Sequence, residues 1–204
     1  MKLGSDVEME LFPITLPKQN ICTETELYYR ADKAVEYDET TGCITLQKGT
    51  TLSLDTYFNC FSYSKYLQYT HARILEVHAK VQGNVQLCIM KAESNNGKIN
   101  RIEKLVRAVY NERLEDVSIQ YDFSKETGNG ILYVEVRTLS EQAVVQFEGY
   151  SSPIQEEKVN PTKLAAVICT YKREEYVKRN LQHLKDTILA NGGDSPKLNE
   201  RNSV

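Results

Sequence analysis

The chain has 204 residues, of which 41% are hydrophobic and 26% charged, and its formal net charge is −3. This composition is ordinary for a globular protein with a buried core, and the length allows one large or two small domains. The acidic balance argues against a nucleic-acid-binding protein, and the scattered lysines and arginines form no polybasic membrane anchor.

The N-terminus and the cysteines both indicate a cytoplasmic protein. Residues 1–10 carry acidic side chains where a secretory signal needs an apolar segment, and no apolar run approaches the roughly twenty residues that span a membrane. The five cysteines are widely spread and form no Cys-x-x-Cys pair, which favours reduced thiols over a disulfide framework or a zinc site. We therefore expect a soluble protein of the cytoplasm.

Alternating apolar and polar residues predict that residues 1–150 are mainly β. The clearest predicted hairpin spans residues 74–91, with its turn at Gly83-Asn84. Pro13 restricts residues 11–16 to an edge strand or an extended lead-in. Further strands are expected at residues 26–30, 43–47, 51–54, 117–123, 132–136 and 145–147. Many short strands with Gly and Asn turns imply an antiparallel β-sandwich or barrel of the jelly-roll kind.

Residues 99–114 fit two interpretations. Four of their apolar residues are spaced as on a helical stripe, and the same residues also fit an irregular strand: Ile102, Leu105, Val106 and Val109. Periodicity alone does not decide between a helix and a strand here.

A change in composition predicts a second domain near the C-terminus. Residues 151–163 are polar, contain two prolines and lack periodicity, as in a domain linker. Residues 164–169 then form an apolar run typical of a buried parallel strand, and the helical spacing of apolar residues from Val177 to Ile188 predicts a helix. Ligands of such α/β units bind at the carboxyl end of the strand, here residues 170–173.

This second segment resembles a known enzyme family. Residues 165–173, Ala-Ala-Val-Ile-Cys-Thr-Tyr-Lys-Arg, are similar to the first strand of the inverting family 2 glycosyltransferases with a GT-A fold. The resemblance implies that Thr170 and Tyr171 contact the uridine of a UDP-sugar and that Arg173 faces the nucleotide. Two plainer interpretations stay open, namely a βα unit of any Rossmann-like protein and an Arg173 that only pairs with Glu174 at the helix start.

The second informative stretch is the tyrosine-rich segment 55–70. Its aromatic residues stand at positions 57, 58, 61, 63, 66 and 69. Aromatic rings offer flat apolar faces on which a sugar could stack, and buried aromatics are also the commonest filling of a sandwich corner. The sequence leaves open whether this segment binds glycan or only packs.

The order of both motifs sharpens the resemblance. Thr-Tyr-Phe-Asn-Cys-Phe at 56–61, a β-rich region and a later Cys-Thr-Tyr-Lys-Arg are similar to the galactofuranosyltransferases, which polymerise galactofuranose from UDP-galactofuranose in bacterial cell-wall or surface polysaccharides. The resemblance implies an accessory β-domain over residues 1–150, a strand over residues 99–114, and the incomplete start of a GT-A domain over residues 164–204. It leaves the donor sugar open.

One departure from the family bears on catalysis. The family needs an Asp-x-Asp pair for a divalent metal and a carboxylate base for the acceptor hydroxyl, and no Asp-x-Asp occurs in this sequence. We therefore expect the chain to be the N-terminal part of a longer enzyme, inactive by itself, without catalytic residues or a bound cofactor of its own. The complete enzyme would use Mg or Mn.

The resemblance also implies partners. We expect a UDP-sugar donor, a glycan or glycolipid acceptor, peripheral association with the inner face of a membrane, and a homo-oligomer, but no nucleic acid. The alternative is a non-catalytic β-sandwich that binds carbohydrate or a protein. The three histidines, His71, His78 and His183, are unclustered and support no metal site or catalytic triad, and we expect His78 on the exposed face of its strand.

Overall fold

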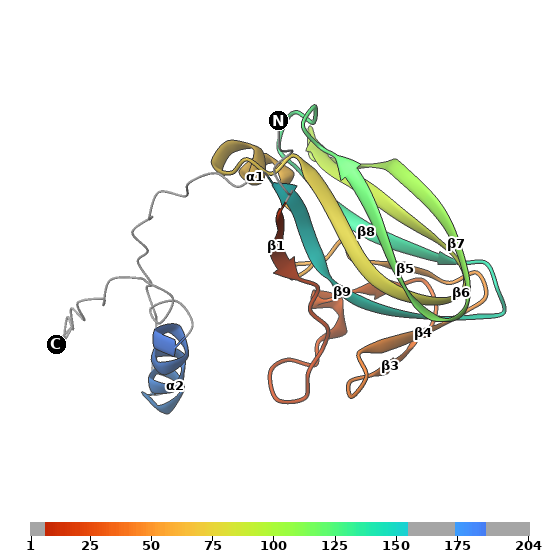
Figure 1. Ribbon diagram of the computed structural model, residues 1–204, viewed down its shortest axis with the longest axis horizontal. Helices are drawn as coiled ribbons and strands as arrows, with labels where there is room; N and C mark the ends of the chain where they lie inside the picture. The colour runs from red at the N-terminus through yellow and green to blue at the C-terminus, as the bar shows by residue number, and fades with distance from the viewer. Residues whose placement is uncertain (1–6, 155–173, 187–204) are drawn as a thin grey trace, which may run out of the picture. The chain divides into compact units, whose positions relative to one another are not determined.

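The computed structural model describes residues 7–154 and 174–186 (Figure 1). The chain divides into two compact units, Met1–Glu157 and Lys158–Val204. The first unit contains all the strands of the described residues and the second contains helix α2 (Glu174–Leu184).

The described strands belong to a single antiparallel sheet. They are β1 (Val7–Pro13), β2 (Arg30–Ala31), β3 (Glu36–Asp38), β4 (Cys43–Gln47), β5 (Thr51–Ser53), β6 (Ile74–Asn95), β7 (Lys98–Asp122), β8 (Gly130–Thr138) and β9 (Gln142–Ile154). The order is β2-β5-β8-β6-β9-β4-β3, with β1 attached to β9 and β7 attached to β6. A 3-10 turn, η1 (Thr25–Leu27), and a short helix, α1 (Tyr63–Tyr69), complete this unit.

Strand β6 joins the two halves of the sheet. Its residues 76–82 pair with β9, whereas its residues 85–93 pair with β8. Strand β7 follows β6 along its other edge, from Ile74 opposite Asp122 to Asn95 opposite Lys98. The sheet curls along this long ladder (Figure 1), so both halves turn the same face inward.

The change of partner takes place at Gly83. Its φ is +97°, and a Cβ added there would lie 2.8 Å from the Gln142 carbonyl oxygen. Directly after Gly83, the Asn84 carbonyl oxygen accepts hydrogen bonds from the backbone N–H groups of Leu139 and Ser140, which lie in the turn between β8 and β9. Glycine is therefore required both by the backbone conformation and by the close approach of β9.

The predicted hairpin over residues 74–91 is wrong. Gly83-Asn84 lies inside β6, directly after a register shift where residues 112–114 of β7 stand opposite Gln82, and the chain reverses at Asn96-Gly97, between β6 and β7. A glycine with positive φ suits a turn and a bulge equally well, so the local pattern could not separate them. Both sides of Gly83 find ladder partners far along the chain, and this keeps the strand continuous.

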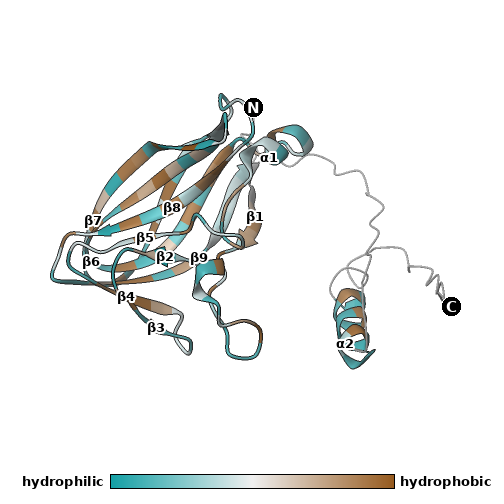
Figure 2. Ribbon diagram, turned by 180° about the vertical axis from the view of Figure 1, so that it is seen from behind, coloured by the Kyte–Doolittle hydropathy of each residue, from teal (hydrophilic) through white to brown (hydrophobic). Residues whose placement is uncertain are grey.

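One hydrophobic core lies inside the curled sheet. Apolar and polar residues alternate along the long strands (Figure 2), and the inward residues of the β8 half and of the β9 half belong to the same cluster. Its members include Ile44, Leu46, Leu52, Leu75, Val77, Val81, Leu87, Ile89, Leu132, Val134, Val136, Val145 and Phe147. The predicted fold class, a mainly β antiparallel domain of the sandwich or barrel kind, is confirmed.

Most of the predicted strands are also confirmed. Residues 43–47 form β4, residues 51–53 form β5, and residues 99–114 lie in β7, as a strand and not a helix. Strand β1 ends at Pro13 and pairs with β9 alone, as expected for an edge. Residues 26–30 differ from the prediction, because they contain part of the 3-10 turn and only the first residue of β2.

The predicted linker begins too early. Residues 151–154 form the end of β9, because β1 offers them antiparallel partners, with Ser151 opposite Glu10 and Ser152 opposite Met9. The remaining linker residues and the predicted strand 164–169 lie outside the described residues. Helix α2 confirms the helix expected after Arg173, and Glu174 and Glu175 occupy its first turn. In the described parts of the chain, no helix is long and apolar enough to cross a membrane.

We predict that Gly83→Ala lowers the free energy of unfolding by about 2–4 kcal/mol, because a Cβ at positive φ would meet the β9 backbone. The matched control is Gly97→Ala, which has a similar φ of +77° but no atom within 4 Å of the added Cβ. That control should cost about 1 kcal/mol. Urea unfolding followed by circular dichroism measures both values, and equal losses would contradict the role given to Gly83.

Candidate functional site

The segment between β5 and α1 presents some of its side chains inward and others outward. Thr56, Asn59 and Phe61 are buried, with exposed fractions of 3%, 0% and 0%. Tyr57 and Phe58, between them, are 80% and 42% exposed. The tyrosine-rich segment therefore serves in part as packing and in part as surface.

The buried Asn59 side chain fixes this segment. Its Nδ2 donates to the carbonyl oxygens of Thr15 (2.7 Å) and Tyr28 (2.6 Å), and its Oδ1 accepts from the Thr15 backbone N–H (2.8 Å). The Tyr150 hydroxyl donates to the Asn59 carbonyl (2.9 Å), and the Thr56 hydroxyl donates to the Tyr28 carbonyl (2.8 Å). A fully satisfied buried amide of this kind holds three distant segments in one geometry.

The outward aromatic rings rest on this fixed base. Phe58 stacks on the buried Tyr28 ring with centroids 4.9 Å apart, and Tyr57 meets Phe58 edge-on at 5.2 Å. Farther along, Phe61 and Tyr63 belong to the core, and Phe61 stacks on Tyr66 at 4.4 Å. Tyr57 and Phe58 therefore form an exposed aromatic step whose backbone is anchored on both sides.

Asp55, two residues before Tyr57 in the chain, forms ion pairs with two arginines. Its Oδ2 accepts from Arg30 Nη1 (3.3 Å) and from Arg101 Nη2 (3.0 Å). The Asp55 side chain is only 9% exposed, whereas the two arginine side chains are 55% and 49% exposed. Both guanidinium groups therefore share one nearly buried carboxylate and face solvent with much of their surface.

A small second cluster lies on the outer face of the sheet and is made of Cys88, Met90, Ala92 and Tyr133, of which Ala92 is the ladder partner of Arg101. Burial raises the pKa of the Tyr133 hydroxyl, and the charge of Asp55 raises it further. Burial likewise raises the pKa of the Cys88 thiol to about 11, which makes it a poor nucleophile.

We call Arg30, Asp55, Tyr57, Phe58 and Arg101 the aromatic–arginine surface. This surface carries groups that are suited to binding a ligand. Its rings offer flat apolar faces, and its guanidinium groups offer planar sets of N–H donors. Within residues 7–154 and 174–186, no three His, Cys, Asp or Glu side chains gather so that they could hold a metal ion. The arrangement could hold a ligand that has both apolar faces and hydroxyl or carbonyl acceptors.

A buried charge network lies elsewhere on the β6–β7 ladder. Lys91 Nζ contacts Glu93 (2.7 Å) and Glu126 (2.9 Å), and Lys104 contacts Glu126 (2.8 Å). The Tyr121 hydroxyl donates to the same Glu126 carboxylate. Burial alone would raise the pKa of Glu126, but these donors outweigh it and lower the pKa to about 2. Because its charges satisfy one another, we interpret the network as structural.

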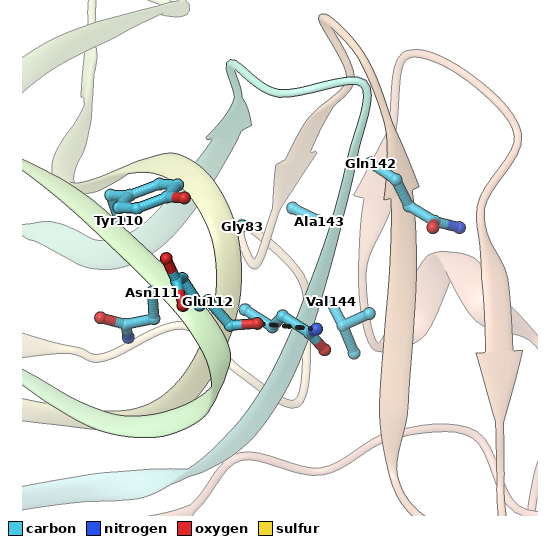
Figure 3. A pocket seen from close by; sticks show the side chains of 8 residues that line it. Gly83, Tyr110, Asn111, Glu112, Gln142, Ala143 and Val144 are labelled. Atoms are coloured by element: carbon cyan, nitrogen blue, oxygen red, sulfur yellow. Dashed lines mark hydrogen bonds between the residues drawn. The ribbon is translucent and has the colours of Figure 1, made fainter.

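Two shallow hollows lie elsewhere on the sheet. The first, of ≈ 350 Å³, surrounds Gly83, with Tyr110 and Gln142 on opposite sides of it (Figure 3). The dashed line in Figure 3 is the hydrogen bond from Gln82 Nε2 to the Glu112 carbonyl (3.1 Å). Sequence analysis missed this hollow because strands distant in sequence meet there.

The second hollow is lined by His78 and Ser151 together with Glu10, Glu148, Gly149 and Tyr150. His78 Nε2 lies 2.7 Å from the Ser151 hydroxyl. The ring stands on the outer face of β6 and is half-buried there, since Val77 and Ala79 on either side face the core. Its outward direction agrees with the prediction, although its exposure is only partial.

The predicted nucleotide-binding residues, Thr170, Tyr171 and Arg173, lie outside the described residues. The structure therefore shows neither their positions nor their contacts. Among the described cysteines, Cys22, Cys43 and Cys60 are free and partly buried, and Cys88 is free and buried.

Comparison with known families decides the family of the chain. The model described as "Galactofuranosyltransferase 2 N-terminal" matches residues 12–153, which run from the last two residues of β1 to the last residue but one of β9. The chain belongs to this family. No curated protein matches the chain significantly.

Several solved structures are distantly similar. The xylanase 10B CBM22-1–GH10 modules of Clostridium thermocellum, in complex with xylohexaose, align with a TM-score of 0.42 and 9% identity, over 80% of this chain and 30% of that one. The CBM22-1 xylan-binding domain of Paenibacillus barcinonensis Xyn10C aligns at 0.39 and 13%, over 78% and 99%. TmCBM61, in complex with β-1,4-galactotriose, aligns at 0.35 and 13%, over 70% and 99%.

We predict that Asn59→Ala lowers the free energy of unfolding by roughly 3 kcal/mol, because it leaves the Thr15 backbone N–H and C=O without their partner. Asn100→Ala, at an exposed position of β7, is the matched control and should cost less than about 0.5 kcal/mol. Thermal unfolding of both variants measures the difference. Similar melting temperatures for both variants would show that Asn59 does not anchor the segment.

A further prediction concerns acid stability. Because the folded pKa of Glu126 is about 2 and its ordinary value is 4.5, its ionised form stabilises the fold fully above pH 4.5. That contribution should disappear as the pH falls from 4.5 towards 2. Glu126→Gln should remove roughly 3 kcal/mol at pH 7 and weaken the pH dependence in this window.

The control for Glu126→Gln is Asp116→Asn, which removes an exposed partner of Lys80. This variant should change stability at pH 7 by less than about 1 kcal/mol and keep the acid transition. Urea titrations at a series of pH values measure both variants. An unchanged pH profile in Glu126→Gln would contradict the assignment.

Proposed function

We propose that the chain is the N-terminal part of a UDP-sugar-dependent inverting glycosyltransferase that builds a cell-wall or surface polysaccharide, with UDP-galactofuranose as its donor. The observation that carries the proposal is the family match over residues 12–153. This match covers the β-domain, which in the proposal is the accessory part of the enzyme.

The C-terminal segment supports the same proposal. Cys-Thr-Tyr-Lys-Arg at 169–173 directly precedes helix α2, which begins at Glu174. A nucleotide site at the carboxyl end of a strand is commonly followed by a helix in this way. In the proposal, Thr170 and Tyr171 contact the uridine, and the planar donor group of Arg173 reaches the uracil or the diphosphate.

The proposal divides the work between the chain and the rest of the enzyme. In an inverting transfer the acceptor hydroxyl attacks the anomeric carbon, a carboxylate base takes its proton and the nucleoside diphosphate leaves. Mg or Mn would neutralise the diphosphate, and the chain has no Asp-x-Asp to hold this ion. We therefore propose that residues beyond Val204 supply the chemistry and that the 204-residue chain alone has no transferase activity.

The proposal extends to surroundings and partners. A glycan or glycolipid acceptor that is assembled inside the cell would place the enzyme in the cytoplasm, at the inner face of the membrane. Association into a homo-oligomer would bring several such domains to one acceptor. The family match supports the glycan partner, while the membrane and the oligomer are proposed from the resemblance of the sequence to the galactofuranosyltransferases.

The second candidate function is a non-catalytic module that binds carbohydrate or a protein. The observation that favours it is the exposure of Tyr57 and Phe58, which closely follow Asp55 in the chain, the residue that pairs with the half-exposed Arg30 and Arg101. Adjacent exposed aromatic rings favour this function because contiguous apolar patches, unlike single exposed residues, mark binding sites.

The test uses the longer protein that we expect to contain this chain. We predict metal-dependent turnover of UDP-galactofuranose, measured as UDP release with a galactofuranose acceptor, and its loss when EDTA removes the metal. Arg173→Ala should lower kcat/KM by about tenfold or more, since it removes a charge-assisted contact to the nucleotide.

The matched control is Lys172→Ala, the neighbouring cation at a variable position of the motif. It should retain most of the activity. If the longer protein releases no UDP from any UDP-sugar, or if Lys172→Ala and Arg173→Ala behave alike, the proposed nucleotide site is wrong.

A further inference from the structure

We infer that the aromatic–arginine surface is a glycan-binding site that holds a segment of an uncharged polysaccharide chain. The inference rests on the proposed function for the identity of the glycan, a galactofuranose polymer. The inference goes beyond the proposed function because it gives the β-domain a binding site of its own, separate from the nucleotide-binding residues.

The two exposed rings are held in place before any ligand binds. An isolated exposed tyrosine is ordinary, but Tyr57 and Phe58 are adjacent and their backbone is anchored by the buried Thr56 and Asn59. Phe58 is further fixed by its stacking on Tyr28. Rings held in place lose little conformational freedom when a ligand stacks on them, which favours binding.

The two arginines of the surface are oriented by a shared carboxylate and keep free N–H donors. One nearly buried carboxylate, Asp55, orients Arg30 and Arg101 by hydrogen bonds to a single oxygen atom, Oδ2. Each guanidinium has five N–H donors, so most of them remain for hydroxyl groups of a ligand. The three charges sum to only +1, which suits an uncharged polyhydroxylated ligand better than a polyanion such as a nucleic acid.

The surface is open and is built from three segments of the chain. Its residues come from β2, from the segment after β5, and from β7, and Asp55 lies 46 positions from Arg101 in the chain. Its two rings and its two guanidinium groups are each more than 40% exposed, as on an open surface and not inside an enclosed pocket. An open surface can hold the middle of a polymer, whereas a monosaccharide would leave most of it uncovered.

Such a site would raise the local concentration of the acceptor polymer near the enzyme. A single weak contact to the polymer keeps the acceptor near the enzyme between successive additions, and two tethered contacts bind more tightly than either alone. The expected affinity of the surface for a short oligosaccharide is therefore modest, and the gain should grow with the length of the glycan.

The experiment measures binding of the 204-residue chain to a galactofuranose oligosaccharide and to a longer galactofuranan, by isothermal titration and by shifts in NMR spectra. The double variant Tyr57→Ala/Phe58→Ala should weaken binding by about tenfold or more, and Arg101→Gln by about fivefold. The matched control is Tyr69→Ala, which removes an equally exposed tyrosine (74%) on α1 and should leave the affinity unchanged. Circular dichroism confirms that each variant is folded.

Two outcomes would overturn the inference: no binding of either probe to the unmodified chain, or equal loss in the double variant and in Tyr69→Ala. If the double variant fails to fold, Arg101→Gln and Tyr57→Phe, which keeps the ring, give the decision: binding should be weakened about fivefold in the first and kept in the second. Because this assay needs no sugar transfer, its failure is distinguishable from absence of UDP-sugar turnover in the longer protein. Binding without turnover would keep the site and refute the proposed enzyme.

Discussion

The architecture depends on the passage of β6 through Gly83. One strand must pair with β9 before this residue and with β8 after it, and β9 approaches so closely that only a hydrogen atom fits at the α-carbon. This junction lets the sheet curl and lets both of its halves bury the same core. A shift of one residue in the register would move every inward side chain outward. The pattern of alternation and the position of the register shift beside Gly83 must therefore agree.

A second constraint connects this core to the surface. Asn59 satisfies its buried amide with the segments around Thr15 and Tyr28, and the Tyr150 hydroxyl of β9 binds its backbone. The price of burying so many polar groups is offset only if every partner is present, which makes the segment rigid. Rigidity has a functional side here, because the neighbouring Tyr57 and Phe58 are held outward in fixed positions instead of collapsing onto the sheet.

Local sequence patterns predicted some of the strands correctly and misplaced other boundaries. The alternation in residues 43–47 and 132–136 predicted strands β4 and β8, and the proline at position 13 indicated an edge, because a missing N–H is tolerated only there. Residues 99–114 needed the family resemblance, since a bulged strand and a helix present apolar residues at similar spacings. The start of the linker was misplaced because the partner of residues 151–154 is β1, at the other end of the unit.

The amino-acid sequence by itself determined the β class, the inward side of most strands, the family, and the aromatic segment as the place to look for a binding surface. Only the tertiary structure decided that Gly83 lies inside a strand, that Phe61 and Tyr63 are buried while Tyr57 is exposed, and that Asp55 joins Arg30 to Arg101. The physical reason is that alternation encodes a side chain's face locally, whereas a hydrogen-bond ladder or an ion pair depends on which distant segment arrives beside it.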